Sequence, residues 1–117
     1  VSSTSTTGLA AGGTINNAGN RATKPTLTIV VSSTGSSGYI NLTNSTTSKL
    51  IQLVPGATGT ITLNAYAETV TRGGASVISE MNGEFWTLAP GNNTLTVATF
   101  NSLTVSAISC AHNAAYV

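Results

Sequence analysis

The chain has 117 residues, of which Ser and Thr make up 35 and Asn another 11, while only seven side chains are charged and Asp is absent. A net charge of +1, with four basic residues scattered singly, argues against nucleic acid as a partner, because nucleic acids are bound through several clustered Lys and Arg contacts. The longest apolar run, residues 27–31, is interrupted by Thr28 and is far shorter than the ~20 residues of a membrane helix.

The composition favours a single domain built from strands. A chain of this length matches the commonest domain size, and its 40% hydrophobic content with a net charge near zero is unlike that of a disordered protein. Strong helix formers are scarce, whereas Thr, Val and Ile favour strands. A single cysteine excludes an intrachain disulfide. The first residue is not Met, which suggests a processed product or a piece of a longer chain. The nearly uncharged surface hints at a protein that sits packed among neighbours.

Residues 1–24 are rich in Ser, Thr, Gly and Ala, with Leu9 and Ile15 as the only large apolar side chains. Such a segment cannot bury enough surface to fold alone. We therefore expect a flexible arm or linker over residues 1–24, or an arm that becomes ordered by lying on a neighbouring subunit. A β-sandwich domain is expected over residues 25–117.

From residue 25 onward, apolar and polar residues alternate with a period of two, and turn residues interrupt the pattern every eight to twelve positions. This pattern is typical of an antiparallel β-sandwich with a jelly-roll-like arrangement. Asn82-Gly83 is the strongest short hairpin signal, because a type I′ turn needs positive φ at both central positions. About eight short strands are expected, among them the runs at residues 27–31, 40–43, 50–53, 61–65, 68–72, 77–78, 95–97 and 103–107.

Few side chains can carry chemistry. Glu80 and Glu84 flank the expected Asn82-Gly83 turn and could approach each other as an acid and a base, but charges beside a hairpin tip are usually solvated. Cys110 and His112 are two residues apart, so on a strand they share one face. They could form a nucleophile–base pair or two metal ligands, although a buried cysteine and an exposed histidine are the simpler interpretation.

Other requirements for catalysis and metal binding are missing. A zinc site needs three or four ligands, and the chain has no other Cys or His and no Asp. Gly-x-Ser-x-Gly does not occur, and neither glycine pair has the strand–helix context of a phosphate-binding loop. We therefore expect no enzyme, no catalytic residue, no metal and no cofactor.

The aromatic residues are the one binding signal. Phe85 and Trp86 are adjacent, so on a strand they point to opposite faces and one of them is expected to leave the core. An exposed ring with nearby Asn side chains is typical of glycan-binding sandwiches. Alternatively, the ring is covered by another sheet, loop or subunit, since protein interfaces are also rich in Trp and Tyr. Tyr39 and Tyr66 are the further candidates for a glycan or interface contact.

Three segments carry a resemblance to a known family. The run over residues 82–97 contains Phe-Trp-Thr-Leu-Ala-Pro-Gly-Asn-Asn-Thr-Leu-Thr and looks like the "aromatic, Leu, x, Pro-Gly-x-Asn-Thr-Leu-Thr" segment of distal tail proteins of long-tailed bacteriophages. Residues 40–53 and 59–74 resemble two upstream segments of that family, in the same order. Asn64 stands where the family usually has Asp, and Ser48 where it has Gly.

The resemblance implies a galectin-like β-sandwich at the C-terminal end of a tail or baseplate protein in the virion. Such proteins form rings at the tail tip and join the tail tube to the receptor-binding apparatus. By this resemblance we expect a structural domain packed against other virion proteins, as a homo-oligomer within an assembly. The alternatives are a module that recognises host-surface glycans, and a decoration domain on a tail-tube, capsid or fibre protein.

Overall fold

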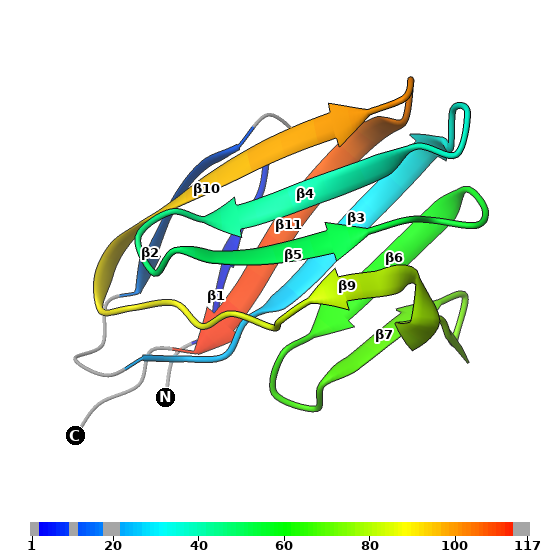
Figure 1. Cartoon of the computed structure of the whole chain (residues 1–117). Coiled ribbons are helices and arrows are strands. Elements are labelled where there is room, and N and C mark those ends of the chain that lie inside the picture. Colours follow the sequence, from blue (N-terminus) through cyan, green and yellow to red (C-terminus); the bar gives the residue numbers. More distant parts are fainter. Residues whose placement is uncertain (1–2, 10–11, 18–21, 114–117) are drawn as a thin grey trace.

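The computed structural model describes residues 3–9, 12–17 and 22–113, which form two facing antiparallel sheets with their strands running in roughly the same direction (Figure 1). The first sheet has six strands in the order β1-β11-β3-β6-β7-β8, and the second has five in the order β2-β10-β4-β5-β9. A 3₁₀ turn, η1, precedes β9. In chain order the elements are β1 (Ser3–Thr6), β2 (Gly13–Asn17), β3 (Thr26–Ser33), β4 (Tyr39–Asn44), β5 (Lys49–Leu53), β6 (Gly59–Asn64), β7 (Thr69–Arg72), β8 (Ala75–Ser76), η1 (Ile78–Glu80), β9 (Met81–Gly83), β10 (Gly91–Phe100) and β11 (Thr104–Asn113).

The core lies between the two sheets and follows the predicted alternation. Inward positions of the central strands are almost completely buried, and their neighbours along the chain are half-buried or exposed. Burying aliphatic side chains of this size stabilises the fold by roughly 1.5–3 kcal/mol each. The largest fully buried side chains are Ile15, Leu27, Ile29, Ile40, Leu42, Ile51, Leu53, Ile61, Leu63, Trp86, Leu88 and Ile108.

The all-β antiparallel sandwich predicted from the sequence is confirmed, with eleven strands over the described residues instead of about eight. The expected strands at residues 27–31, 40–43 and 50–53 correspond to β3, β4 and β5. Asn101-Ser102 joins β10 to β11, and both residues have positive φ (56° and 64°), as the central residues of a type I′ turn do.

The hairpin predicted at Asn82-Gly83 is wrong. Both residues belong to β9 and pair with Gln52 and Ile51 of β5. A strand was expected at residues 77–78, but Val77 precedes and Ile78 begins η1 instead. Gly83 has φ of 90°, and a Cβ there would collide with the carbonyl oxygen of Leu50. The glycine is therefore needed for a close approach between two strands, which the dipeptide alone does not distinguish from a tight turn.

The segment expected as an arm contributes to both sheets over its described residues. β1 pairs with β11, and β2 pairs with β10. Leu9 and Ile15, its two large apolar side chains, are only 2% and 1% exposed. Both side chains are buried in the core between the two sheets. The described part of the segment therefore packs on the sandwich, although its composition contains too few apolar residues for it to fold alone.

A cluster of buried asparagines holds the irregular segment between β9 and β10 against the second sheet. The side chain of Asn93 accepts from the N–H of Ala89 (2.8 Å) and donates to its carbonyl oxygen (2.8 Å). Asn44 donates to the carbonyl of Thr87 (3.0 Å), and Asn17 donates to that of Leu88 (3.1 Å). This segment has only a single bridge, from Leu88 to Thr23, and the asparagine bonds supplement it. They fix the chain at residues 87–89, directly after Trp86.

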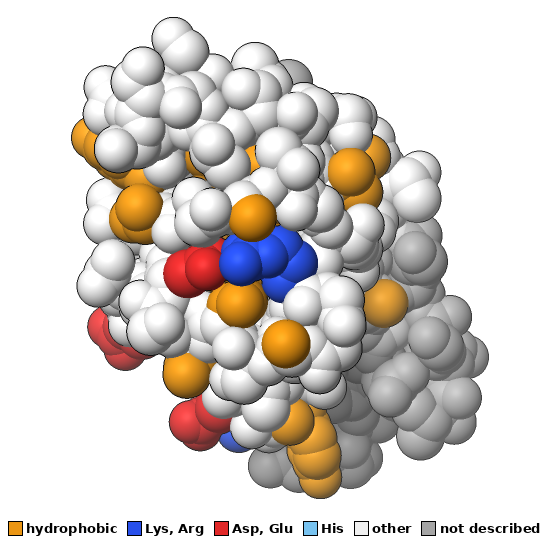
Figure 2. All heavy atoms as spheres, turned by 90° about the vertical axis from the view of Figure 1, so that its right-hand side faces the viewer, with side chains coloured by type: hydrophobic (Ala, Val, Ile, Leu, Met, Phe, Trp, Pro, Cys, Tyr) orange, Lys and Arg blue, Asp and Glu red, His pale blue; other side chains and the backbone are white. Residues whose placement is uncertain are grey.

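The outer face of the first sheet is an uncharged array of small polar side chains. The register aligns Ser109, Thr28, Thr62, Thr71 and Ser76 in one row across five strands, which we call the hydroxyl row. The face seen in Figure 2 is likewise mostly uncharged, with single apolar side chains scattered over it and few charged groups. Neutral, flat surfaces of this kind do little to keep protein molecules apart in solution.

Candidate functional site

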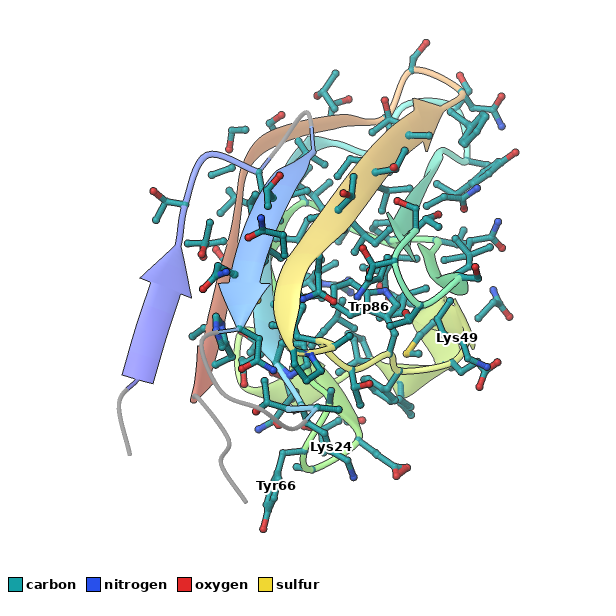
Figure 3. All side chains as sticks on the ribbon, turned by 90° about the vertical axis from the view of Figure 1, so that its left-hand side faces the viewer. Lys24, Lys49, Tyr66 and Trp86 are labelled. Carbon is teal, nitrogen blue, oxygen red and sulfur yellow. The ribbon has the colours of Figure 1, made fainter. Side chains whose placement is uncertain are left out.

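The two adjacent aromatic residues lie in and against the core. Trp86 is 1% exposed, and its indole N–H donates to the carbonyl oxygen of Leu42 (3.1 Å); Figure 3 shows it inside the sandwich. Phe85 is half-buried and packs against the same core. The expectation that Trp86 offers a ring to a glycan does not fit this burial, because a ring enclosed on all sides has no face left for a ligand.

Tyr39 uses its ring within the protein. It stands opposite Phe100 in the pairing of β4 with β10, and the two rings stack with their centroids 4.6 Å apart and their planes inclined by 16°. Offset stacking at this separation is a favourable arrangement for aromatic rings. Tyr39 therefore contributes to the surface of the second sheet through its edge, while one ring face is covered by its neighbour.

Tyr66 is the candidate that is open to solvent, with 81% of its side chain exposed. It lies in the turn between β6 and β7, between the strands that were expected at residues 61–65 and 68–72. Asn64 closes this turn by accepting from the N–H of Ala67 (3.0 Å), and the N–H of Ala65 donates to the carbonyl of Pro25 (3.0 Å). Both bonds hold the backbone on either side of Tyr66 in place, and the ring projects from the end of the molecule (Figure 3).

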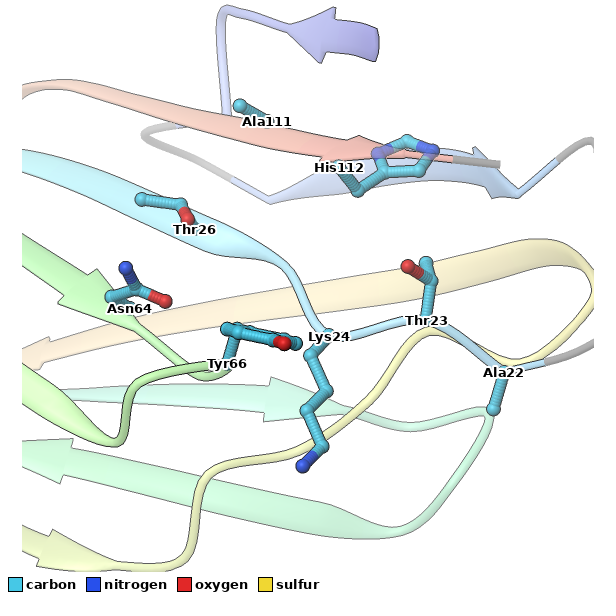
Figure 4. Close-up of a pocket in the computed structure, with 8 residues that line it drawn as sticks. All are labelled: Ala22, Thr23, Lys24, Thr26, Asn64, Tyr66, Ala111 and His112. Atoms are coloured by element: carbon cyan, nitrogen blue, oxygen red, sulfur yellow. The ribbon is translucent and has the colours of Figure 1, made fainter. Parts of the chain in front are cut away.

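A pocket of about 560 Å³ opens beside this ring, and we call it the Tyr66 pocket (Figure 4). Its floor is the end row of the first sheet, where Ala111 pairs with Thr26 and Thr26 pairs with Asn64. The pocket is open above this floor because the side chains of Ala111 and Thr26 are small, and Tyr66 forms one wall.

The segment before β3 forms the opposite wall of the Tyr66 pocket. Ala22, Thr23 and Lys24 line it, with Thr23 held in place by a two-residue bridge to Leu88. Of the lining residues that the structure describes, Lys24 alone is charged, and its side chain lies next to Tyr66 in Figure 4. Neither of the two ion pairs among the described residues includes this lysine. Its ammonium group is therefore available to an acidic ligand.

A second, smaller hollow of about 350 Å³ adjoins the Tyr66 pocket. Lys24 lines both, and Glu68, Glu84, Phe85 and Thr87 line only the smaller one. The described lining of the smaller hollow thus carries two negative charges and one positive charge, whereas that of the Tyr66 pocket carries only the positive charge of Lys24.

Cys110 and His112 share the inner face of β11, as their spacing predicted, but their surroundings do not suit catalysis. Cys110 is completely buried, and burial raises the pKa of its thiol to about 12, so the thiol stays protonated at neutral pH. His112 was expected to be exposed, which is wrong: it is 5% exposed. Its Nε2 lies 3.0 Å from the carbonyl oxygen of Asn16, whereas its buried Nδ1 has no hydrogen-bond partner. This ring also lines the Tyr66 pocket.

The carboxylates expected to meet across a hairpin are held apart by separate ion pairs. Glu80 binds Arg72 at 2.6 Å, and this hydrogen bond raises the pKa of the arginine. Glu84 lies 3.3 Å from Lys49 in an exposed pair. An acid–base couple needs both carboxyl groups at one reacting bond, and this arrangement does not provide it.

Within the part of the chain that the structure describes, no three His, Cys, Asp or Glu side chains gather as metal ligands would. Among the same residues, no helix is long and apolar enough to cross a membrane. The sequence analysis did not single out Lys24, Asn64 or Thr26 as site residues. They come together through the pairing of β3 with β6. The one feature of the sequence that could have pointed to this site was Tyr66 between two alanines.

Three comparisons place the chain among known proteins. A family model described as "Siphovirus-type tail component, C-terminal domain" matches residues 18–112. A search of curated proteins finds no match. Among solved structures, the chain is similar to the crystal structure of the SPP1 Dit protein, described as a paradigm of the hub adsorption apparatus in phages that infect Gram-positive bacteria. The TM-score is 0.72 at 19% sequence identity, and the match covers 95% of this chain but only 46% of that protein.

Proposed function

Because the chain belongs to the family of siphovirus-type tail components, matched over their C-terminal domain, we propose that it is a structural domain of the phage tail tip with no enzymatic activity. The observation that carries this proposal is the family match over residues 18–112, which spans nearly the whole sandwich. The match to SPP1 Dit adds a shared fold over 95% of this chain. By extension from that protein, the domain contributes to the hub that joins the tail to the adsorption apparatus.

The surface supports a role among neighbouring subunits. The hydroxyl row and the positions around it present no charged side chain over β3, β6 and β11. The two described ion pairs, Lys49–Glu84 and Arg72–Glu80, lie outside these three strands. A flat, neutral face can be covered by another protein without the cost of removing charges from water. We propose that other virion proteins, including further copies of the same chain, cover this face in the assembled tail.

Cryo-electron microscopy of the source particle tests the proposal. We expect density for this sandwich at the tail tip, repeated around the tail axis, with the first sheet facing a neighbouring subunit. Density on the tail tube, the capsid or a fibre would instead identify a decoration domain. Particles that lack the chain, together with a monodisperse, monomeric protein in solution, would contradict the structural role.

The inference that the protein is not an enzyme has its own test. The residues that come closest to a catalytic set are Cys110, Glu80 and Glu84, and none of them faces a second reactive group. We therefore expect virions that carry Cys110→Ser or Glu84→Gln to assemble and adsorb like the wild type. A loss of infectivity with normal tail assembly would point to a chemical role for the altered group.

A further inference from the structure

We propose that the Tyr66 pocket binds a saccharide that carries an acidic group, a carboxylate or a phosphate. This inference goes beyond the structural role, which requires no small-molecule site, and it stands or falls separately from that role. It is carried by three features of the pocket: a floor with polar side chains, an exposed aromatic wall and a cation outside the described ion pairs.

The floor supplies hydrogen-bonding groups that nothing else in the described protein uses. The hydroxyls of Thr23 and Thr26 bond to no other described group. The Oδ1 of Asn64 accepts a hydrogen bond from the N–H of Ala67, and its Nδ2 amide group is left to donate to a ligand. Sugar hydroxyls act both as donors and as acceptors, and this mixture of hydroxyl and amide groups satisfies both roles.

Tyr66 supplies the apolar wall. A hexose has a face of C–H groups that packs on an aromatic ring, and the Tyr66 ring is exposed enough to receive it. The turn bonds of Asn64 and Ala65 fix the backbone that carries the ring. A Tyr side chain has only two rotatable angles, so little conformational entropy is lost when a ligand immobilises the ring. The ring and the floor meet at the corner where a pyranose would lie.

Lys24 defines the charge of the ligand. Among the described residues that line the pocket it is the only charged side chain, and no carboxylate among the described ion pairs neutralises it. One ammonium group attracts one acidic substituent. A nucleic acid strand would call for several cations along its backbone, and an acidic peptide would find no matching row of lysines. A sugar with a single acidic group fits both the charge and the hydroxyl-lined floor.

His112 lies at the β11 end of the pocket, but its unpaired nitrogen does not face a ligand on the floor. The side chain is on the inner face of β11, opposite the face that carries Ala111, and its Nε2 lies 3.0 Å from the carbonyl oxygen of Asn16 in the second sheet. Its Nδ1 has no hydrogen-bond partner among the described residues and is buried, so a ligand bound on the floor does not reach it.

Titration of the ¹⁵N-labelled chain with glucuronic acid, glucose 6-phosphate and glucose, followed by NMR, tests the site. We expect saturable shifts in the amide signals of residues 23–26 and 64–67, with at least one acidic sugar bound about fivefold more tightly than glucose, the factor that ~1 kcal/mol of charge attraction gives. The two acidic sugars separate a carboxylate from a phosphate as the preferred group.

Matched variants assign the contacts. Tyr66→Ala should weaken the binding of all three sugars by about two- to tenfold, since a stacked ring contributes roughly 0.5–1.5 kcal/mol. Lys24→Met should remove only the preference for acidic sugars. Lys49→Met is the control, because Lys49 is also exposed but lies away from the pocket (Figure 3). The fluorescence of buried Trp86 reports whether each variant is folded.

Several results would overturn the assignment. Shifts that do not saturate with any of the three sugars would remove the site. Equal affinity for glucose and both acidic sugars would remove the role of Lys24. An equal loss of preference in Lys49→Met would show attraction by overall charge and not by the pocket. Shifts confined to residues 84–87 would place binding in the smaller hollow instead.

Discussion

Truncation of Asn93 to alanine is the sharpest test of how the second sheet holds the segment that carries Trp86. The substitution removes two short hydrogen bonds to Ala89, both of 2.8 Å, and weaker contacts to the carbonyls of Gly91 (3.2 Å) and Ile15 (3.4 Å). Each of the short bonds contributes roughly 1 kcal/mol, and a half-buried N–H left without an acceptor costs about 1 kcal/mol more. We therefore expect Asn93→Ala to lower the free energy of unfolding by about 3 kcal/mol.

Urea unfolding followed by Trp86 fluorescence measures this loss, because the chain has a single tryptophan and it is buried. With a slope of about 1.5 kcal/mol/M, a loss of ~3 kcal/mol moves the midpoint down by about 2 M. Asn92→Ala is the control, since that side chain accepts one bond from Asn16 (2.9 Å) at the surface, and its loss should cost under about 0.5 kcal/mol. Equal midpoints for the two variants would refute the bonding role assigned to Asn93.

Five further substitutions have expected outcomes. Gly83→Ala should destabilise the fold by roughly 2 kcal/mol or more, and Gly73→Ala by about 1 kcal/mol, because both have positive φ but only the former would meet backbone; similar denaturation midpoints would contradict this. Ser48→Gly should raise thermal stability by about 1 kcal/mol, since Ser48 has φ of 59°, and an unchanged melting temperature would argue against strain there. Burial raises the Cys110 pKa from 9.0 to about 12, so above about pH 9 the unfolded chain loses a proton that the folded chain keeps, and stability falls as the pH rises toward about 12; unfolding curves of Cys110→Ala should lack this part of the pH dependence. Trp86→Ala should cost about 4 kcal/mol and weaken cooperative unfolding, whereas retention of wild-type stability would mean that the ring is not in the core.

Most of the fold follows from the alternation of side chains along the chain. Residues 26–31 and 39–44 bury every second side chain, as a two-sided strand must. Local patterns of this kind specify a strand, and they specify which of its faces is buried. They do not specify the partner strand, which is why residues 82–83 could be predicted as a turn but form β9 beside β5.

The described part of the first 24 residues illustrates a second limit. Its composition is poor in apolar residues, and only Leu9 and Ile15 stand out. Whether two such side chains suffice depends on whether open places exist in the core and on the sheet edges beside β10 and β11. Those places are created by strands whose paired residues lie 74 (Asn17 and Gly91) to 110 (Ser3 and Asn113) positions away along the chain. Composition within a window cannot contain that information.

One departure from the family pattern is explained by the backbone. Ser48 occupies a position where related sequences are expected to carry Gly, and it adopts the left-handed conformation that Gly adopts without strain. The turn from β4 to β5 keeps its shape because Asn44 binds the N–H of Thr46 (3.1 Å) and Ser45 binds the carbonyl of Thr94 (3.0 Å). The resemblance thus reflects a backbone requirement that Ser meets at some cost in stability.

The candidate site was predictable only in part. Tyr66 was one of four aromatic residues singled out, and its neighbours Lys24, Asn64 and Thr26 were not. Aromatic residues in the sequence cannot be sorted into core and surface without the pairing of strands. That pairing encloses Trp86, covers Tyr39 with Phe100 and leaves Tyr66 on a turn.

The structural role and the saccharide pocket occupy different parts of the molecule. The hydroxyl row crosses the middle of the first sheet, whereas the floor of the Tyr66 pocket is the end row of the same sheet, beyond Thr28 and Thr62. A neighbouring subunit that covers only the middle of the sheet would leave the pocket open, and one that also covers Tyr66 would close it. Sugar titration of intact tails beside the free chain therefore distinguishes a site that works in the virion from one that assembly buries: equal binding in both would mean that the interface ends short of Tyr66.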